Sequence, residues 1–180
     1  IQGRPDVPPR LFDLVPRYIE KYGYKDCLFA GKVDRQWVKY NGQKFYDMTN
    51  SISHGLLKLG IKKGDRIALI ATNCPEWNMI DFAIQQVGAI CIPIYPTISH
   101  DDYDYIFKHS ETSLVFVINK HLYNKVSDII TSTPSIKDTY LIRASEGMKS
   151  LQELIELGNE YRDEAALEAS KAEVKNEDVA

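Results

Sequence analysis

Two short loops carry the residues best suited to contact a ligand. The first, residues 72–75, follows an apolar run typical of a β-strand and leads into a run with helical periodicity. Asn73 stands just before that helix, where the free backbone N–H groups can bind a phosphate or a carboxylate. Glu76 in the first turn already complements the helix dipole and argues against an anion. Asn73 is therefore a candidate ligand-binding residue, and ordinary capping by Thr72 or Asn73 is the alternative.

The second loop, residues 95–98, follows the next apolar run and contains Tyr95, Pro96 and Thr97. Pro93 lies inside that run and removes a backbone donor, which predicts a strand near a sheet edge or at its end. The two prolines, three residues apart, stiffen the exit of the strand and fix where Tyr95 and Thr97 point. A rigid turn that positions the next helix is one interpretation of Tyr95, Pro96 and Thr97.

The sequence offers no recognisable set of metal ligands or catalytic side chains. The four histidines (His54, His100, His109 and His121) lack zinc spacing. The acidic residues that follow Ser99 lack the glycine and distal glutamate of a calcium loop and fit the start of a helix. Neither a P-loop, nor a Rossmann glycine motif, nor a Gly-x-Ser-x-Gly elbow occurs in the sequence. We assign no catalytic residue and no metal site to the chain.

The composition describes an ordinary globular protein, with 44% hydrophobic and 26% charged residues in 180. The net charge is −3 with both signs interspersed, which argues against nucleic-acid binding. No apolar run is long enough to be a transmembrane segment. The three cysteines (Cys27, Cys74 and Cys91) are widely spaced without a Cys-x-x-Cys pair, which favours a reducing, cytoplasmic compartment.

The periodicity of apolar residues predicts an α/β fold. Helices are expected over residues 9–22, 43–59, 75–87, 99–109, 121–132 and 151–161, and strands over 66–71, 89–94, 113–119 and 139–143. Strands 27–30 and 36–40 are expected to form a small N-terminal hairpin around a turn at 31–35. Continuous apolar strands that alternate with helices predict a parallel sheet flanked by helices on both faces. Both candidate loops then lie at the carboxyl ends of strands, where ligands bind near a switch in strand order.

The composition changes after residue 161. Residues 162–178 are dominated by Glu, Ala and Lys and show no apolar stripe, which predicts a solvated helix or a linker. We therefore divide the chain into an incomplete α/β subdomain over residues 1–161 and a polar helix or linker over residues 162–180.

Four segments carry a resemblance to a known enzyme family. They are Gly-Leu-Leu-Lys-Leu-Gly at 55–60, Lys-Gly-Asp-Arg at 63–66, Asn-Cys-Pro-Glu-Trp at 73–77, and Val-Gly-Ala at 87–89 with Pro-Ile-Tyr-Pro-Thr at 93–97. In this order and spacing they resemble the N-terminal part of the AMP-forming acyl-CoA synthetases, over about residues 11–142. The third and fourth segments look most like the long-chain fatty acid–CoA ligases.

The resemblance implies a chemistry. Such enzymes form acyl-CoA from a fatty acid, ATP and CoA through an acyl-adenylate, with Mg²⁺, and the segment that matches Tyr95, Pro96 and Thr97 lies beside the tunnel for the pantetheine arm of CoA. The family's Ser/Thr/Gly-rich loop, metal-binding glutamate, ribose-binding aspartate and mobile-domain lysine have no matching positions here. The glycine-rich loop would be expected shortly after Ala180. The chain is thus interpreted as the N-terminal portion of a longer ligase, inactive and without a cofactor by itself.

Other interpretations stay open. A freestanding binding or dimerisation module derived from the same lobe would form a homodimer or bind a partner without catalysis, and a flavodoxin-like domain would bind a flavin. A fatty acid substrate is compatible with a cytoplasmic enzyme that is peripheral at the membrane, although no basic amphipathic helix argues for it. The residues present do not define the acyl chain length.

Overall fold

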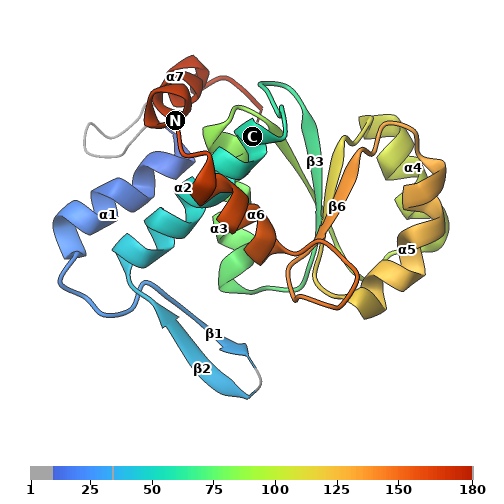
Figure 1. Cartoon of the computed structure of the whole chain (residues 1–180), viewed down its shortest axis with the longest axis horizontal. Coiled ribbons are helices and arrows are strands. Elements are labelled where there is room, and N and C mark those ends of the chain that lie inside the picture. Colours follow the sequence, from blue (N-terminus) through green and yellow to red (C-terminus); the bar gives the residue numbers. More distant parts are fainter. Residues whose placement is uncertain (1–9, 34, 180) are drawn as a thin grey trace.

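The computed structural model describes residues 10–33 and 35–179 (Figure 1). A short 3₁₀ helix, Leu11–Asp13, leads into α1 (Leu14–Tyr22). The other helices are α2 (Gly42–Lys58), α3 (Pro75–Gln86), α4 (His100–Ser110), α5 (Lys120–Ser132), α6 (Leu151–Glu160) and α7 (Glu164–Glu173). The strands are β1 (Phe29–Val33), β2 (Gln36–Tyr40), β3 (Arg66–Ile70), β4 (Ile90–Ile94), β5 (Leu114–Val117) and β6 (Asp138–Leu141).

The core of the fold is a four-stranded parallel sheet in the order β4-β3-β5-β6. Strand β3 lies inside it, paired with β4 on one side and β5 on the other. The last four side chains of β3, Ile67 to Ile70, are fully buried, as expected for a strand covered on both faces. The predicted α/β fold with a parallel sheet is therefore confirmed.

Helices cover both faces of the sheet (Figure 1). On one face Ile67 and Leu69 join a core formed with α2, α3 and α6. On the other, Ala68 and Ile70 pack with α4 and α5. The alternation along β3 thus sends successive side chains into two separate cores. Helices α1 and α7 lie outside the first of these layers (Figure 1).

Strand β4 is an edge of the sheet, as Pro93 predicts. The Ile90 N–H donates to the carbonyl of Asp65 beside β3, at 2.8 Å. Because successive peptide groups of a strand face opposite sides, Cys91 and Pro93 direct their nitrogens away from β3. Pro93 therefore stands where its missing donor costs the sheet no hydrogen bond.

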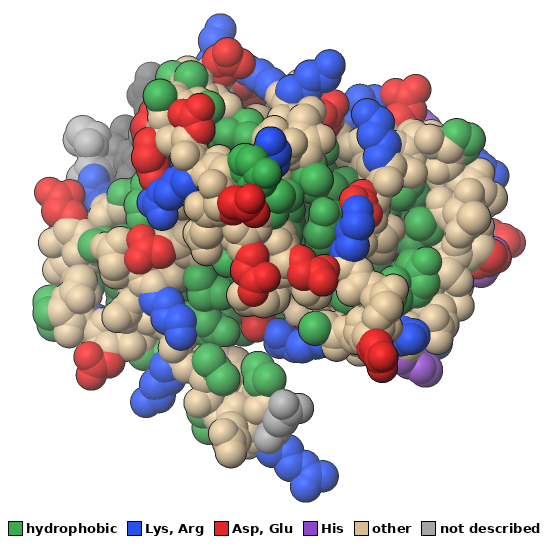
Figure 2. Space-filling view, in the orientation of Figure 1, with side chains coloured by type: hydrophobic (Ala, Val, Ile, Leu, Met, Phe, Trp, Pro, Cys, Tyr) green, Lys and Arg blue, Asp and Glu red, His purple; other side chains and the backbone are tan. Residues whose placement is uncertain are grey.

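The N-terminal hairpin forms, but its first strand differs from the prediction. Strand β1 begins at Phe29 and continues to Val33, through most of the segment expected to be the turn. Gly31, interpreted from the sequence as a turn residue, lies inside the strand and packs against α3. A Cβ at Gly31 would lie 2.6 Å from Pro75 Cδ, so glycine here permits close approach rather than a turn. The hairpin projects from the lower edge of the molecule in Figure 2.

Of the two alternatives for residues 162–178, a solvated helix or a linker, the structure forms a helix, α7 (Glu164–Glu173), but this helix is not solvated on all sides. Leu167 is fully buried and Lys171 nearly so, and the helix contacts α2 and α3. One buried leucine and one long aliphatic stem are enough to dock a short helix, and they leave no periodic stripe in the sequence. The division of the chain at residue 161 stays a prediction.

Charges of both signs are interspersed over the face shown in Figure 2. Among the helices that the structure describes, none has the length and apolar character needed to cross a bilayer.

Helices α2 and α6 pack at unusually short range through two glycines. A Cβ at Gly158 would lie 1.8 Å from the carbonyl oxygen of Ser51 and 2.8 Å from the nitrogen of Gly55. A Cβ at Gly55 would lie 2.6 Å from the carbonyl oxygen of Leu154. The backbones of the two helices thus touch, which places α6 firmly against the first core.

We expect Gly158→Ala to lower the free energy of unfolding by at least about 2 kcal/mol, because the added methyl group meets backbone atoms that cannot rotate away. Alanine gains about 1 kcal/mol in helix propensity, which is too small to offset this. Urea unfolding followed by circular dichroism measures the change. Glu160→Ala, at an exposed position two residues further on, is the control and should stay within about 0.5 kcal/mol of wild type. A Gly158→Ala protein as stable as this control would contradict the packing described.

Candidate functional site

The carboxyl end of the sheet is the candidate site. The chain leaves β3 toward α3 on one face and leaves β5 toward α5 on the other. The order β4-β3-β5-β6 therefore switches direction between β3 and β5, the position at which open α/β sheets bind ligands. The loops after β3, β4 and β6 and the hairpin all meet near this end.

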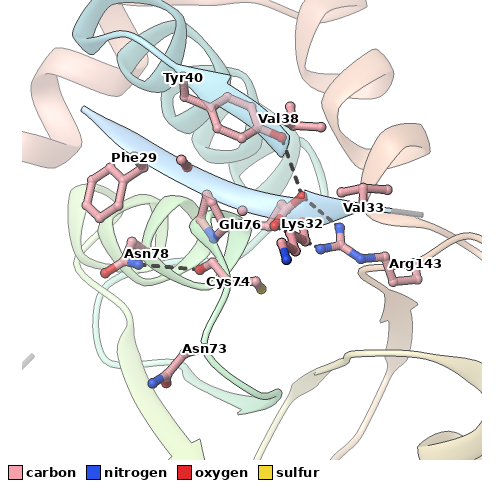
Figure 3. Close-up of a pocket in the computed structure, with 13 residues that line it drawn as sticks. Phe29, Lys32, Val33, Val38, Tyr40, Asn73, Cys74, Glu76, Asn78 and Arg143 are labelled. Atoms are coloured by element: carbon pink, nitrogen blue, oxygen red, sulfur yellow. Dashed lines mark hydrogen bonds and ion pairs between the residues drawn. The ribbon is translucent and has the colours of Figure 1, made fainter. Parts of the chain in front are cut away.

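A cavity of about 250 Å³ lies between the hairpin, the start of α3 and the loop after β6 (Figure 3). The hairpin contributes an apolar wall that includes Phe29, Val38 and the ring of Tyr40. The polar side is made by the start of α3 together with Lys32, Asn73 and Arg143, and includes Cys74, Glu76 and Asn78.

A buried ion pair lies at the centre of this polar side. Arg143 Nη1 donates to Glu76 Oε1 at 2.7 Å, and Nη2 donates to Oε2 at 3.2 Å, so the contact is bidentate. The Glu76 side chain is 8% exposed and that of Arg143 34%. Burial alone would raise the pKa of Glu76, but the hydrogen bonds and charge of Arg143 outweigh it and hold that pKa below its usual value. The carboxylate stays charged and ties α3 to the loop after β6.

The same pair affects two neighbouring groups. The Tyr40 hydroxyl lies 3.5 Å from Glu76 Oε1, and burial and the Glu76 charge raise the pKa of Tyr40. Burial raises the pKa of the Cys74 thiol to about 11. Because the thiolate is the nucleophilic form, Cys74 is a poor nucleophile at neutral pH. The cavity thus holds a neutral thiol and a neutral phenol around a fixed ion pair.

Helix α3 begins without the side-chain cap that the sequence suggests. Its N-cap is Cys74, which makes no capping hydrogen bond, and Pro75 occupies the first turn as predicted. Thr72 and Asn73 are both exposed, so capping by either is wrong. The chain turns one residue later than expected, and Glu76 supplies the negative charge of the first turn.

The candidate residues Asn73 and Tyr95 are brought together by the fold. They line a second cavity of about 190 Å³, whose other walls are Ala71, Trp77, Pro93 and Ile94. The Tyr95 side chain is 80% exposed, while its carbonyl oxygen accepts a hydrogen bond from the Tyr103 hydroxyl at 3.1 Å. Pro96 and Thr97 lie elsewhere, in an open depression of about 430 Å³ beside α4 and α5 with Tyr103, Leu122 and Lys125.

Asn73 lines both the cavity under the hairpin and the cavity beside Tyr95. Each of these cavities is smaller than the roughly 300 Å³ at which small-molecule sites begin. Neither accommodates a whole cofactor or substrate. These two cavities therefore offer walls for a ligand rather than a complete pocket, and a ligand-binding role for the four candidates stays a prediction.

Sequence reasoning missed Arg143, which it placed only at the end of a strand. Arg143 and Glu76 are 67 residues apart. A buried glutamate requires a cation, but nothing local in the sequence says which of the many lysines and arginines supplies it.

The acidic helix start after Ser99 is explained by capping. Ser99 and Asp102 form a reciprocal capping box at the start of α4. Among residues 10–33 and 35–179, no group of three His, Cys, Asp or Glu side chains could hold a metal ion. Of the histidines, His100 pairs with Asp128 at 2.8 Å on the surface, and His54 is buried under α7.

The family model described as "AMP-binding enzyme" matches residues 16–180. The chain therefore belongs to the family of AMP-binding, adenylate-forming enzymes. Among its relatives, long-chain-fatty-acid–CoA ligase FadD15 of Mycobacterium bovis is 29% identical over 153 residues, which are 85% of this chain and 25% of that protein. Long chain acyl-CoA synthetase 4 of Arabidopsis thaliana is 29% identical over 160 residues, which are 86% of this chain and 22% of that protein. The resemblance to acyl-CoA synthetases is confirmed.

Two solved structures share the fold. The long-chain-fatty-acid–CoA ligase FadD1 of Archaeoglobus fulgidus superposes with a TM-score of 0.71 at 22% identity, over 88% of this chain and 32% of that one. The anthranilate CoA ligase AuaEII, in complex with anthranoyl-AMP, superposes with a TM-score of 0.70 at 20% identity, over 84% and 28%. The chain spans about a quarter of the length of the curated relatives it matches.

We expect Arg143→Ala to lower the free energy of unfolding by about 3 kcal/mol at pH 7, because it leaves a buried carboxylate without its partner. Arg66→Ala is the matched control, since Arg66 pairs with Glu111 at 2.8 Å where Glu111 is 71% exposed. That surface pair should contribute less than about 1 kcal/mol. Urea unfolding of both variants measures the difference. Equal losses would show that the Glu76–Arg143 pair contributes no more than a surface pair.

The pair should also make stability depend on pH. Because the folded protein holds the pKa of Glu76 below the ordinary value of 4.5, its contribution is complete above that value. It is then lost as pH falls through the lowered pKa of the folded state. Urea unfolding between pH 6 and pH 3 should show wild type losing more stability than Glu76→Gln, which has no carboxylate to protonate. Parallel curves for the two proteins would exclude Glu76 as a source of acid sensitivity.

Proposed function

We propose that this chain is the N-terminal portion of a long-chain fatty acid–CoA ligase, which forms acyl-CoA from a fatty acid, ATP and CoA. The observation that carries the proposal is the family match over residues 16–180, together with relatives that are fatty acid–CoA ligases. In the proposed reaction the carboxylate attacks the α-phosphorus of ATP, which releases pyrophosphate and gives an acyl-adenylate. The thiol of CoA then attacks the acyl carbon and releases AMP.

We propose that the groups this reaction needs around ATP are supplied by other parts of the protein than residues 10–33 and 35–179. No metal-ligand set occurs among residues 10–33 and 35–179, so the Mg²⁺ of the proposed reaction is not assigned to them. The two cavities that Asn73 lines are each below the roughly 300 Å³ at which small-molecule sites begin. We propose that residues 1–161 form one lobe of the AMP-binding domain, which is inactive and binds no cofactor alone. Residues 162–180 would lead to its phosphate-binding loop.

Within this lobe we propose that Asn73 faces the ligand at the start of α3 and that Tyr95, Pro96 and Thr97 line the path of CoA. Two features support this role. The Tyr95 side chain is 80% exposed although its backbone is held by Tyr103. Asn73 is exposed at the switch in strand order, and it is not the N-cap residue of α3. An exposed aromatic ring on a rigid backbone is a suitable wall for the pantetheine arm of CoA.

The compartment and assembly are part of the same proposal. The three cysteines are free (Cys27, Cys74 and Cys91), which suits a reducing, cytoplasmic location. A fatty acid substrate would bring the enzyme to the membrane surface as a peripheral protein. A homodimer is compatible with the proposal but is not required by it.

Fatty acid-dependent release of pyrophosphate tests the reaction. The protein expressed from the full open reading frame should release pyrophosphate only when fatty acid and Mg-ATP are both present. The 180-residue chain, run beside it at equal concentration, should release none. Activity of the short chain would overturn the assignment of the ATP-binding groups to other parts of the protein. Silence of the full protein toward all fatty acids would favour the alternative, a non-catalytic binding or dimerisation module built on this lobe.

Substitution of Tyr95 in the full protein tests the ligand-facing role. We expect Tyr95→Ala to raise the KM for CoA about tenfold, which corresponds to one lost aromatic contact of about 1.4 kcal/mol, and to leave the KM for ATP within about twofold. Tyr105→Ala is the matched control, because Tyr105 is a similarly exposed tyrosine (64%) on α4. Equal KM values for CoA in the two variants would remove Tyr95 from the site.

A further inference from the structure

Helix α7 is held to the rest of the molecule by different chemistry at its two ends. At its C-terminal end, Arg10 donates to the carbonyl of Lys171 at 2.5 Å, and Lys63 donates to the carbonyl of Glu173 at 2.7 Å. Lys63 also pairs with Asp178 at 2.6 Å. Two cations on the last carbonyls of a helix complement the helix dipole.

The N-terminal end depends on a buried histidine. The backbone N–H of Asp163, the N-cap of α7, donates to His54 Nδ1 at 3.3 Å. The His54 side chain is 1% exposed. Because Nδ1 accepts this hydrogen bond, the imidazole must be neutral with its proton on Nε2. Among the residues that the structure describes, that Nε2 has no hydrogen-bond partner, and Glu164 Oε1 lies 3.7 Å away.

Between its two ends, α7 packs against a side of α2 that carries a buried polar atom without a hydrogen-bond partner among the described residues. Tyr46, Asn50 and His54 follow one another at four-residue spacing along one side of α2. Lys171 Nζ lies 3.5 Å from the Tyr46 hydroxyl, and Asp163 contacts His54. Helices α2 and α7 therefore run antiparallel. The four-residue spacing along α2 then places Asn50 across from Leu167. The Asn50 Oδ1 atom is buried without a hydrogen-bond partner, which costs free energy of docking.

We propose that α7 is a hinged strap: protonation of His54 releases its N-terminal half from α2, while its C-terminal end stays attached through Arg10 and Lys63. The inference does not depend on the proposed ligase activity.

The release follows from the donor and acceptor positions. A protonated imidazole carries hydrogen on both nitrogens, so Nδ1 would confront the Asp163 N–H with a second donor. The charge would also be placed in a buried site with one carboxylate, Glu164, at 3.7 Å. Glu164 is itself paired with Arg162. The surrounding protein thus offers the imidazolium no full partner.

The charged groups around His54 shift its pKa in both directions. Burial is the largest effect and lowers the pKa of His54, Glu164 opposes it, and Arg162 and Lys171 reinforce it. The docked form therefore prefers the neutral imidazole. The free energy of docking is complete above the ordinary pKa of about 6.5 and declines as pH falls below it, until the lowered pKa of the docked form is reached.

Amide hydrogen exchange followed by NMR on the 180-residue chain tests the proposal. Protection factors, corrected for the intrinsic pH dependence of exchange, are measured between pH 7.5 and pH 5.5. At Asp163, Ala166 and Leu167 they should fall toward the limit of about tenfold that is set by a released imidazole with a pKa near 6.5. The amide of Val174, which donates to the carbonyl of Lys171, should change less than twofold. The chemical shifts of the His54 ring carbons should change with a midpoint below pH 6.5.

Three variants make the result specific. In His54→Asn the amide oxygen replaces Nδ1 as acceptor and cannot be protonated, so the fall in protection should disappear. In Glu164→Gln the pKa of His54 in the docked form should fall further, because the group that favours the imidazolium is removed. The fall in protection between pH 7.5 and pH 5.5 should then be at least as large as in wild type. His121→Gln, at an exposed position on α5, should behave as wild type.

Unchanged protection of residues 163–167 in wild type, or an equal fall in His54→Asn, would overturn the proposal. If α7 does not dock at any pH in His54→Asn, the protection factors of Glu164→Gln become the decisive test of the proposal. A smaller fall in protection in Glu164→Gln than in wild type would then exclude His54 as the titrating group. Loss of protection along the whole of α7, Val174 included, would replace the hinge by complete undocking and overturn the role of Arg10 and Lys63.

Discussion

Burial of residues 67–70 of β3 is the constraint on which the rest of the structure depends. A strand paired on both sides and covered on both faces needs apolar side chains at successive positions, and Ile67, Ala68, Leu69 and Ile70 supply them. Its two faces then require helices on both sides of the sheet. The right-handed crossovers that deliver these helices must leave β3 and β5 in opposite directions. The switch in strand order, and with it the candidate site, follows from this one strand.

The site at the carboxyl end is built by joining parts that are distant in the chain. The ion pair between Glu76 and Arg143 ties the first turn of α3 to the loop after β6, and Tyr40 brings the hairpin to the same carboxylate. Gly31 allows the hairpin to approach Pro75 closely enough to cover the pair. These contacts fix the base of the loop that carries Asn73. A rigid loop base is what a lobe needs if it presents one wall of a site to the rest of a larger enzyme.

The sequence predicted the parts of the fold that are governed by local pattern. The alternation of apolar strands and helices, the edge position of β4 marked by Pro93, and the hairpin all follow from propensity and periodicity over a few residues. What it could not predict are contacts between residues far apart. Arg143 as the partner of Glu76, the docking of α7 through Leu167, and the polar contact of His54 with Asp163 each depend on tertiary placement. The cap of α3 was wrong because the chain turns one residue later than the polar side chains suggest.

The position of Pro93 has a consequence for how the protein avoids self-association. The outer edge of β4 is a row of backbone groups that another strand could extend, as happens in aggregation and domain swapping. Of the two residues whose nitrogens face outward, Cys91 has an N–H and Pro93 has none. An incoming strand would meet one donor where a regular ladder offers two, and the ring would obstruct its approach. A single proline thus protects the open side of the sheet against unwanted extension, at no cost to the hydrogen bonds between β4 and β3.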